Sequence, residues 1–81
     1  MKIEEVKNLD KVIGTKQTIR ALKEDKLKLV LIAKDADEHI IKNTQEIAAQ
    51  KNVEINYVES MQQLGIACGI QVGAATVGIL K

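Results

Sequence analysis

The nucleophile and base that this sequence offers for conventional catalysis are Cys68 and His39. A thiol becomes a strong nucleophile when a base lies within hydrogen-bonding reach and a third group orients that base. His39 falls in the polar first turn of an expected helix, whereas Cys68 stands among glycine, alanine and isoleucine, and no third residue is evident. A small buried apolar residue explains Cys68 better, and a solvated surface residue explains His39. We therefore expect no enzymatic activity and no catalytic residues.

Metal and nucleotide sites have equally little support in the sequence. One histidine and one cysteine do not make a zinc site. The run Asp35-Ala36-Asp37-Glu38 lacks the ligand spacing and the glycine of a calcium loop, so a helix cap is the preferred interpretation. The glycines match neither the dinucleotide fingerprint nor the Gly-Lys-Ser/Thr ending of a phosphate loop. We expect no metal and no cofactor.

One segment has the chemistry to contact a nucleic acid: Gly14-Thr15-Lys16-Gln17-Thr18-Ile19-Arg20. It places a glycine, polar side chains and free backbone N–H groups at an expected helix start, which favours anions. Lys16 is a long donor, and Gln17 both donates and accepts, so it can read base edges. Arg20, one turn on, can reach a phosphate. Any capped helix start looks similar, so an ordinary helix end stays open as an alternative.

A second segment is apolar and bounded by glycines. In Gly69-Ile70-Gln71-Val72-Gly73, two branched side chains flank a glutamine in an expected loop. Exposed apolar groups of this kind can pack on splayed, unpaired bases, although residue type alone favours a place in the core. Tyr57 is the sole aromatic residue, which excludes an aromatic stacking platform. Any RNA contact must therefore use a helix end and loops.

Alternating helices and strands must position these two segments. The apolar run after Lys28 predicts a strand covered on both faces. Residues 60–80 carry no charge, but their glutamines and glycines favour helix, loop and strand over a membrane span. The order of elements predicts an α/β layered fold. The first expected elements are a short helix at 2–8, a strand at Val12-Ile13, a helix from Thr15, its N-cap, to about Lys23, and a strand from Leu27 to Ala33. A helix at about 38–51 follows, with Asp37 as its cap and Asn52 at its end, and then a strand from Val53 to Val58. The last two are a short helix that begins at the capping box Ser60–Gln63 and ends at Gly69, and a strand from Ala74 to Leu80.

Length and composition fit one small folded domain over residues 1–81. The chain is 46% hydrophobic, 28% charged and carries a net charge of +1. Residues 1–34 hold nine Lys/Arg and five Asp/Glu, a balance of +4, whereas residues 35–81 hold three and six, a balance of −3. A polyanion should therefore prefer the surface built by the first part, although ordinary charge scatter is an open alternative. The single cysteine excludes an internal disulfide, and Met1 to Asp10 do not read as a signal peptide, so we expect a cytoplasmic protein.

The two candidate segments, taken with the order and spacing of the rest, resemble a known family. The similarity runs from about Val12 to Leu80 and includes Ile13 to Thr18, Leu29 to Asp37, Val58 to Met61, Leu64-Gly65, Ala67 to Ile70 and Val72 to Ala75. It is to the kink-turn RNA-binding ribosomal proteins of the L-seven-Ae and L-thirty-e type, in particular the small bacterial members called YbxF-like. The resemblance implies a three-layer α-β-α sandwich with a four-stranded mixed sheet. It also implies binding to a kink-turn, a bent RNA internal loop with tandem sheared G·A pairs.

In that family the helix start after the glycine lies against the G·A pairs, and an apolar loop packs over bases of the bulge. The RNA-binding set that the resemblance implies here is Gly14, Thr15, Lys16, Gln17, Thr18, Arg20, Lys34, Ile70, Gln71, Val72, Gly73 and Ala74. Two departures affect the favoured RNA sequence. Archaeal members carry Asn-Glu where this chain has Lys16-Gln17, and many relatives have a bulkier residue at Gly73.

The sequence thus predicts a monomeric kink-turn RNA-binding protein associated with the ribosome or translation, with ribosomal RNA or an mRNA leader as its partner and no contact with a membrane. Binding the bent RNA better than the extended form would stabilise the kink. Two alternatives remain open. One is a protein-interaction module on the same fold, and the other is an RNA-recruiting subunit for a separate modifying enzyme.

Overall fold

The computed structural model describes residues 3–81, and the expected helices and strands are all found there. The expected helix at 2–8 is the 3-10 helix η1, and Lys2 lies outside the described residues. The last strand begins at Thr76, two residues later than expected. Along the chain the elements are η1 (Ile3–Asn8), β1 (Lys11–Ile13), α1 (Thr15–Lys23), β2 (Leu27–Ala33), α2 (Glu38–Gln50), β3 (Glu54–Val58), α3 (Met61–Ala67) and β4 (Thr76–Leu80).

The strands form one mixed sheet in the order β1-β4-β2-β3. Strands β2 and β3 are parallel, and β4 is antiparallel to both of its neighbours, β1 and β2. Consequently β1, β2 and β3 end at the same edge of the sheet, and β4 begins there. The helices α1, α2 and α3 all begin near this edge. We call it the binding edge, because the candidate segment that opens α1 follows β1 there and the candidate loop leads into β4 there.

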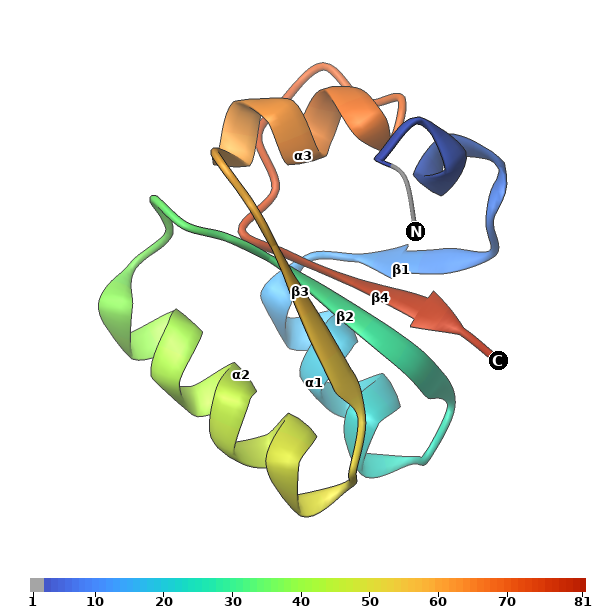
Figure 1. Cartoon of the computed structure of the whole chain (residues 1–81), viewed down its shortest axis with the longest axis vertical. Helices are drawn as coiled ribbons and strands as arrows, with labels where there is room; N and C mark the ends of the chain where they lie inside the picture. Colours follow the sequence, from blue (N-terminus) through green and yellow to red (C-terminus); the bar gives the residue numbers. More distant parts are fainter. Residues whose placement is uncertain (1–2) are drawn as a thin grey trace.

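Helices cover both faces of the sheet, so the predicted three-layer sandwich is confirmed (Figure 1). On one face, η1 and α3 bury Val6 and Leu64 against the odd-numbered β2 residues 29, 31 and 33. On the other face, α1 and α2 bury Leu22 and Ala48 against Val30 and Ile32. Side chains alternate between the faces of a strand, and β2 is apolar on both because it is covered twice, as expected.

One irregularity interrupts β2 at its start. Leu27 pairs with Leu80 while Leu29 pairs with Ile79, so β2 holds one extra residue there. Such a bulge breaks the alternation. Leu27 accordingly joins the α1 and α2 side of the core instead of the side that holds Leu29, and Lys28 is left exposed.

Local signals set most helix ends where the sequence placed them. The Asp37 carboxylate accepts a hydrogen bond from the His39 N–H at 2.8 Å, and Asn52 follows α2 with φ 56°. Ser60 Oγ accepts from the Gln63 N–H at 3.1 Å, and Gly69 ends α3 with φ 80°. No helix over residues 3–81 is both long and apolar enough to span a membrane.

Candidate nucleic-acid interface

The first part of the candidate site is the start of α1 at the binding edge. Gly14 precedes the helix with φ 109° and ψ 150°, a conformation that residues with a Cβ rarely adopt. Its N–H donates to the Thr76 carbonyl at 3.0 Å, and its own carbonyl accepts from the Thr18 N–H at 2.9 Å. No side chain caps this helix. The first N–H groups of α1, which have no partner within a helix, are therefore available to an anion.

The prediction that Thr15 caps α1 is wrong. Gly14 occupies the cap position, and Thr15 is the first helical residue. The Thr15 hydroxyl instead accepts a hydrogen bond from the Thr76 hydroxyl at 2.9 Å, across 61 positions of sequence. Thr76 is fully buried, so this bond ties the start of α1 to the start of β4 beneath the surface.

The long side chains of the first two turns of α1 lie at the surface. Lys16 and Gln17 are exposed, and the Arg20 side chain is 82% exposed with its Nε 3.8 Å from a Glu24 carboxylate oxygen. A Cβ on Gly14 would lie 2.7 Å from Gln17 Oε1, so the Gln17 side chain lies directly over the glycine. Gly14 is thus required by its φ angle, whereas the flexible end of the Gln17 side chain could move aside for a Cβ.

Thr18 does not lie with these side chains. It is fully buried, and its hydroxyl has no hydrogen-bond partner among the described residues. Its inclusion among the RNA-contacting residues is corrected, because a side chain of zero exposure cannot reach a bound RNA. Thr18 faces the core because residues 18, 21 and 22 form the buried stripe of α1.

The second part of the candidate site is the loop of residues 70–73, which we call the apolar loop. Its backbone lies against α3, since the Ile70 N–H donates to the Gly65 carbonyl at 3.0 Å. A Cβ on Gly65 would lie only 2.1 Å from the Val72 carbonyl oxygen. Beyond the loop, the Ala74 N–H donates to the Met61 carbonyl at 3.0 Å. The loop is therefore held at both ends and along its length.

The side chains of this region divide between the surface and the core. Val72 is 71% exposed, and Gln71 and Gly73 are exposed, whereas Ile70 is half-buried against the core. Ala74 is only 4% exposed. Its inclusion among the RNA-contacting residues is therefore also corrected, since its methyl group packs in the core.

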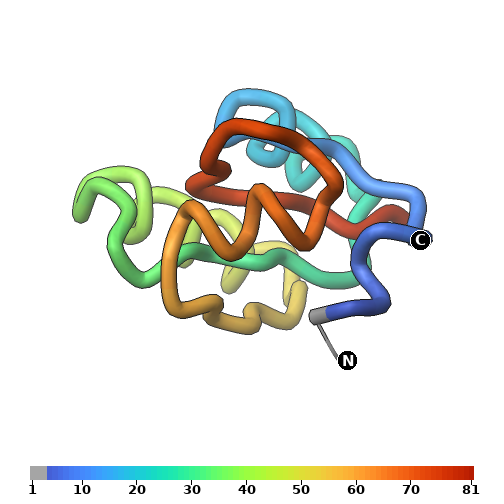
Figure 2. The backbone as a smooth tube through the Cα atoms, turned by 90° about the horizontal axis from the view of Figure 1, so that it is seen from above, coloured from blue at the N-terminus to red at the C-terminus, as the bar shows by residue number. Residues whose placement is uncertain are grey.

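Hydrogen bonds at the binding edge tie the start of α1 to the start of β4, the strand that follows the apolar loop. The Gly14 N–H and the Thr15 hydroxyl both bond to Thr76, and the carbonyl of the preceding Ala75 accepts from the Ala33 N–H at 2.9 Å. Figure 2 shows the loop after α3 leading into β4, whose first residue, Thr76, bonds to the segment that opens α1. The start of α1 and the apolar loop thus both adjoin the start of β4. The predicted site residues that are exposed or partly exposed there are Gly14, Thr15, Lys16, Gln17, Arg20, Ile70, Gln71, Val72 and Gly73.

Lys34 follows β2 at the same edge. Its N–H donates to the Val58 carbonyl at 2.8 Å, and its ammonium group pairs with the Glu59 carboxylate at 2.8 Å. Both side chains are more than half exposed, so water screens this pair and its contribution to stability is small. Lys34 is near the site, but part of its charge is offset by Glu59.

Sequence reasoning missed three residues that shape this surface. Met61 is 36% exposed and touches the loop, because a Cβ on Gly73 would lie 3.2 Å from Met61 Cβ. Gly65 allows the loop to lie on α3, and Thr76 joins the two parts. Only Gly65 carried a signal: glycine is unfavourable inside a helix, so its presence in α3 indicates a close backbone approach.

The residues that could have supported catalysis or metal binding are used otherwise. Cys68 is buried, and this burial raises the pKa of its thiol, which Lys11 opposes only in part. His39 is exposed. The Asp35 carboxylate accepts from the Met61 N–H at 2.7 Å, so Asp35 and Asp37 each serve a helix start. Over residues 3–81, no three His, Cys, Asp or Glu side chains gather as metal ligands.

The fold and this surface define a small α/β sandwich with an uncapped helix start beside an exposed apolar loop. The chain belongs to the ribosomal protein L7Ae/L30e/S12e/Gadd45 family, whose sequence model matches residues 2–81. The family resemblance stated from the sequence is therefore confirmed.

Relatives of known sequence and structure agree with that membership. An RNA-binding protein of Geobacillus thermodenitrificans is 59% identical over 70 residues, or 86% of this chain and 85% of that protein. The RNA-binding protein YbxF of Geobacillus stearothermophilus is 56% identical over the same shares. The large ribosomal subunit protein eL8 of Halobacterium salinarum is 34% identical over 83% of this chain and 57% of its own length. The solved 15.5kD RNA binding protein of Giardia lamblia superposes with a TM-score of 0.88 at 26% identity, over 98% of this chain and 70% of that one.

Proposed function

We propose that this protein binds kink-turn RNA through the start of α1 and the apolar loop, and thereby stabilises the bent form of the RNA. The observation that carries the proposal is the junction at Thr76, which ties an uncapped helix start to the strand that follows the apolar loop and its exposed valine. The bacterial relatives, which are named RNA-binding proteins, support RNA as the partner.

The helix start supplies hydrogen-bonding groups for paired bases. Gln17 can donate and accept at once, which suits the base edges of sheared G·A pairs. The free N–H groups of the first turn and the Lys16 ammonium group favour nearby phosphates. Arg20 lies one turn further along α1 and can reach the backbone of the same RNA.

The apolar loop supplies a surface for unpaired bases. Val72 offers an exposed branched side chain, and Met61 extends the apolar area beside it. A kink-turn exposes unstacked bases that a straight duplex keeps within the stack, so apolar contact of this kind favours the bent form. A protein that binds the bent form more tightly shifts the RNA toward it without any chemical step. The proposal therefore assigns no enzymatic activity.

Gel-shift titrations with two RNAs test the proposal. One contains a kink-turn, and the other is a fully paired duplex of equal length and charge. We expect the kink-turn RNA to bind far more tightly, and binding to weaken only modestly with salt because few cations line the surface. Equal affinities for the two RNAs would contradict the assignment.

We further propose that the protein acts as a cytoplasmic monomer on ribosomal RNA or an mRNA leader. The similarity to a large ribosomal subunit protein supports a connection with the ribosome. Crosslinking in cells followed by sequencing of the bound RNA tests this directly. Recovery of proteins without kinked RNA would favour a protein-interaction module, and recovery of RNA together with a modifying enzyme would favour a recruiting subunit.

A further inference from the structure

The binding edge separates two surfaces of opposite charge. On one side α1 carries Lys16, Arg20 and Lys23 and no acidic residue. On the other side Asp35, Asp37 and Glu38 lie between β2 and the first turn of α2, while Glu59 after β3 is paired with Lys34. Because Asp35 and Asp37 accept hydrogen bonds from helix starts, their charges are fixed in place. A polyanion that reaches this edge meets attraction along α1 and repulsion toward α2.

Two of the α1 cations are free of local carboxylates. Arg20 lies 3.8 Å from Glu24, a residue that also pairs with Lys26. Lys16 and Lys23 make no ion pair with any residue in 3–81. Both are exposed. A cation without a partner keeps its full charge for a ligand, and here two such cations stand on the same helix.

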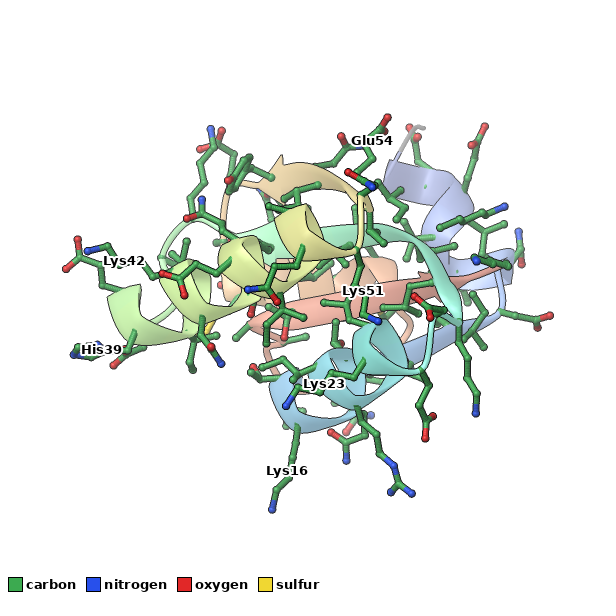
Figure 3. All side chains as sticks on the ribbon, turned by 90° about the horizontal axis from the view of Figure 1, so that it is seen from below. Lys16, Lys23, His39, Lys42, Lys51 and Glu54 are labelled. Atoms are coloured by element: carbon green, nitrogen blue, oxygen red, sulfur yellow. The ribbon has the colours of Figure 1, made fainter. Side chains whose placement is uncertain are left out.

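The spacing of these two lysines places them along one line. Seven residues make nearly two turns of an α-helix, so Lys16 and Lys23 project from the same side of α1, about 10 Å apart along its axis. Figure 3 shows both side chains projecting from α1, with Lys51 across the seam between α1 and α2. Lys51 is partly neutralised by Asp25 at 3.4 Å. The free positive charge therefore runs along α1, away from the binding edge.

We infer that one stem of the bound RNA leaves the kink along α1, with its phosphates on Lys16 and Lys23, and away from the acidic turn at residues 35–38. This inference rests on the proposed function and adds the direction of the RNA beyond the kink. A duplex presents a phosphate for every ~1.7 Å of its axis, so a stem lying along α1 passes several phosphates over the interval between the two lysines. Lys23 then becomes a contact that only a sufficiently long stem can make.

The test uses a set of kink-turn RNAs that share one kink and differ in stem length. Each stem in turn is either short or lengthened by about one helical turn, and affinity is measured from about 50 to about 200 mM salt. We expect the natural protein to gain affinity from lengthening one stem and not the other. Lys23→Gln should bind the short RNA as the natural protein does but lose the gain from the long stem. Loss of one phosphate contact lowers the slope of log affinity against log salt concentration by about 0.9. The fall in affinity across that salt range then becomes smaller by a factor of about 3–4.

Lys42→Gln is the matched control, because it removes the same charge from an exposed lysine without an ion pair in residues 3–81. Figure 3 places Lys42 on α2, far from Lys23. It should keep the full gain from the long stem. The inference is overturned if neither stem adds affinity, if both add it equally, or if the two variants behave alike. Failure of the natural protein to prefer the short kink-turn RNA over a duplex would instead reject the proposed function itself.

Discussion

The two parts of the candidate interface are held in place by different means. At the start of α1, the backbone is fixed by the conformation of Gly14 and its bond to Thr76, while the side chains of Lys16, Gln17 and Arg20 are exposed. In the apolar loop, the backbone itself lies on α3 through Gly65. Its main exposed side chain, Val72, is short.

This difference separates the residues that would contact RNA from the residues that hold the backbone of the site in place. At α1 the side chains that would touch RNA do little for the fold, so replacing them should change binding alone. In the apolar loop the supporting residue is a glycine beneath the backbone, so changing it should affect the fold and binding together. Four sets of substitutions, with effects that we expect to differ in size, test this division.

Gly65→Ala should have the largest effect, because its new Cβ would meet the Val72 carbonyl oxygen at 2.1 Å. The loop must then move off α3. Overpacking of this kind costs about 1–3 kcal/mol of unfolding free energy, and displacement of Val72 should weaken binding to kink-turn RNA as well. Denaturant unfolding and RNA titration measure the two effects. Gly73→Ala is the control, since its nearest contact is Met61 Cβ at 3.2 Å, and we expect a clearly smaller loss of stability.

Val72→Glu should abolish most RNA binding while leaving the fold intact. Val72 is 71% exposed, so a charge there should change the unfolding free energy by less than about 0.5 kcal/mol. The carboxylate would nevertheless face phosphates and bases. Thermal melting and RNA titration of the same variant give the answer. An unfolded variant would show that Val72 supports the core, and an unchanged affinity would remove the apolar loop from the interface.

At the helix start, Gln17→Ala and Arg20→Ala should separate base reading from attraction to the RNA backbone. Gln17→Ala should cost about 1–3 kcal/mol of binding free energy and lose the preference for G·A pairs. Arg20→Ala should weaken binding to all RNAs alike and reduce the salt slope by about 1. Titrations against kink-turns with and without G·A pairs distinguish the two. If Gln17→Ala retains the parent affinity, base reading does not lie at this helix start.

Thr76→Val should have the smallest effect, because it removes the hydroxyl that bonds to Thr15 and joins the two parts. One neutral hydrogen bond contributes about 0.5–1.5 kcal/mol to stability. We expect a loss of that size together with a small loss of RNA affinity. Thr44→Val is matched to it, since Thr44 is also fully buried and its hydroxyl donates to the Ile40 carbonyl at 2.7 Å within α2. That variant should lose stability but keep its RNA affinity.

Helix ends and strands that depend on neighbouring residues could be predicted from the sequence. The exposure of individual site residues, which depends on distant contacts, could not. Asp37, Asn52 and Gly69 mark helix ends through local geometry, and each was placed correctly. The doubly covered strand β2 was predicted from its unbroken apolar run. The sandwich as a whole was not built from these signals alone, because its four-stranded mixed sheet came from the family resemblance.

The errors at the site arise from contacts across the fold. Thr15 has the right residue type for a cap, but a partner 61 positions away takes its hydroxyl. Thr18 and Ala74 stand within exposed segments, yet the sheet beneath buries both side chains. The two segments could be identified from the sequence. Which of their residues face outward could not, because that depends on how α1 and the apolar loop pack against the rest of the fold.

The position of β4 also bears on how the protein is made. A ribosome synthesises a chain from its N-terminus, at about 5–20 residues per second. Strand β4 follows the other strands in the sequence but lies between β1 and β2, and Val77 and Ile79 are fully buried in the core. Until residues 76–80 have been made, β1 has no strand beside it, and the start of α1 has no Thr76 to bond with. A nascent chain that stops short of β4 therefore has neither the complete sheet nor the bond between Thr76 and Thr15, because both require residues 76–80.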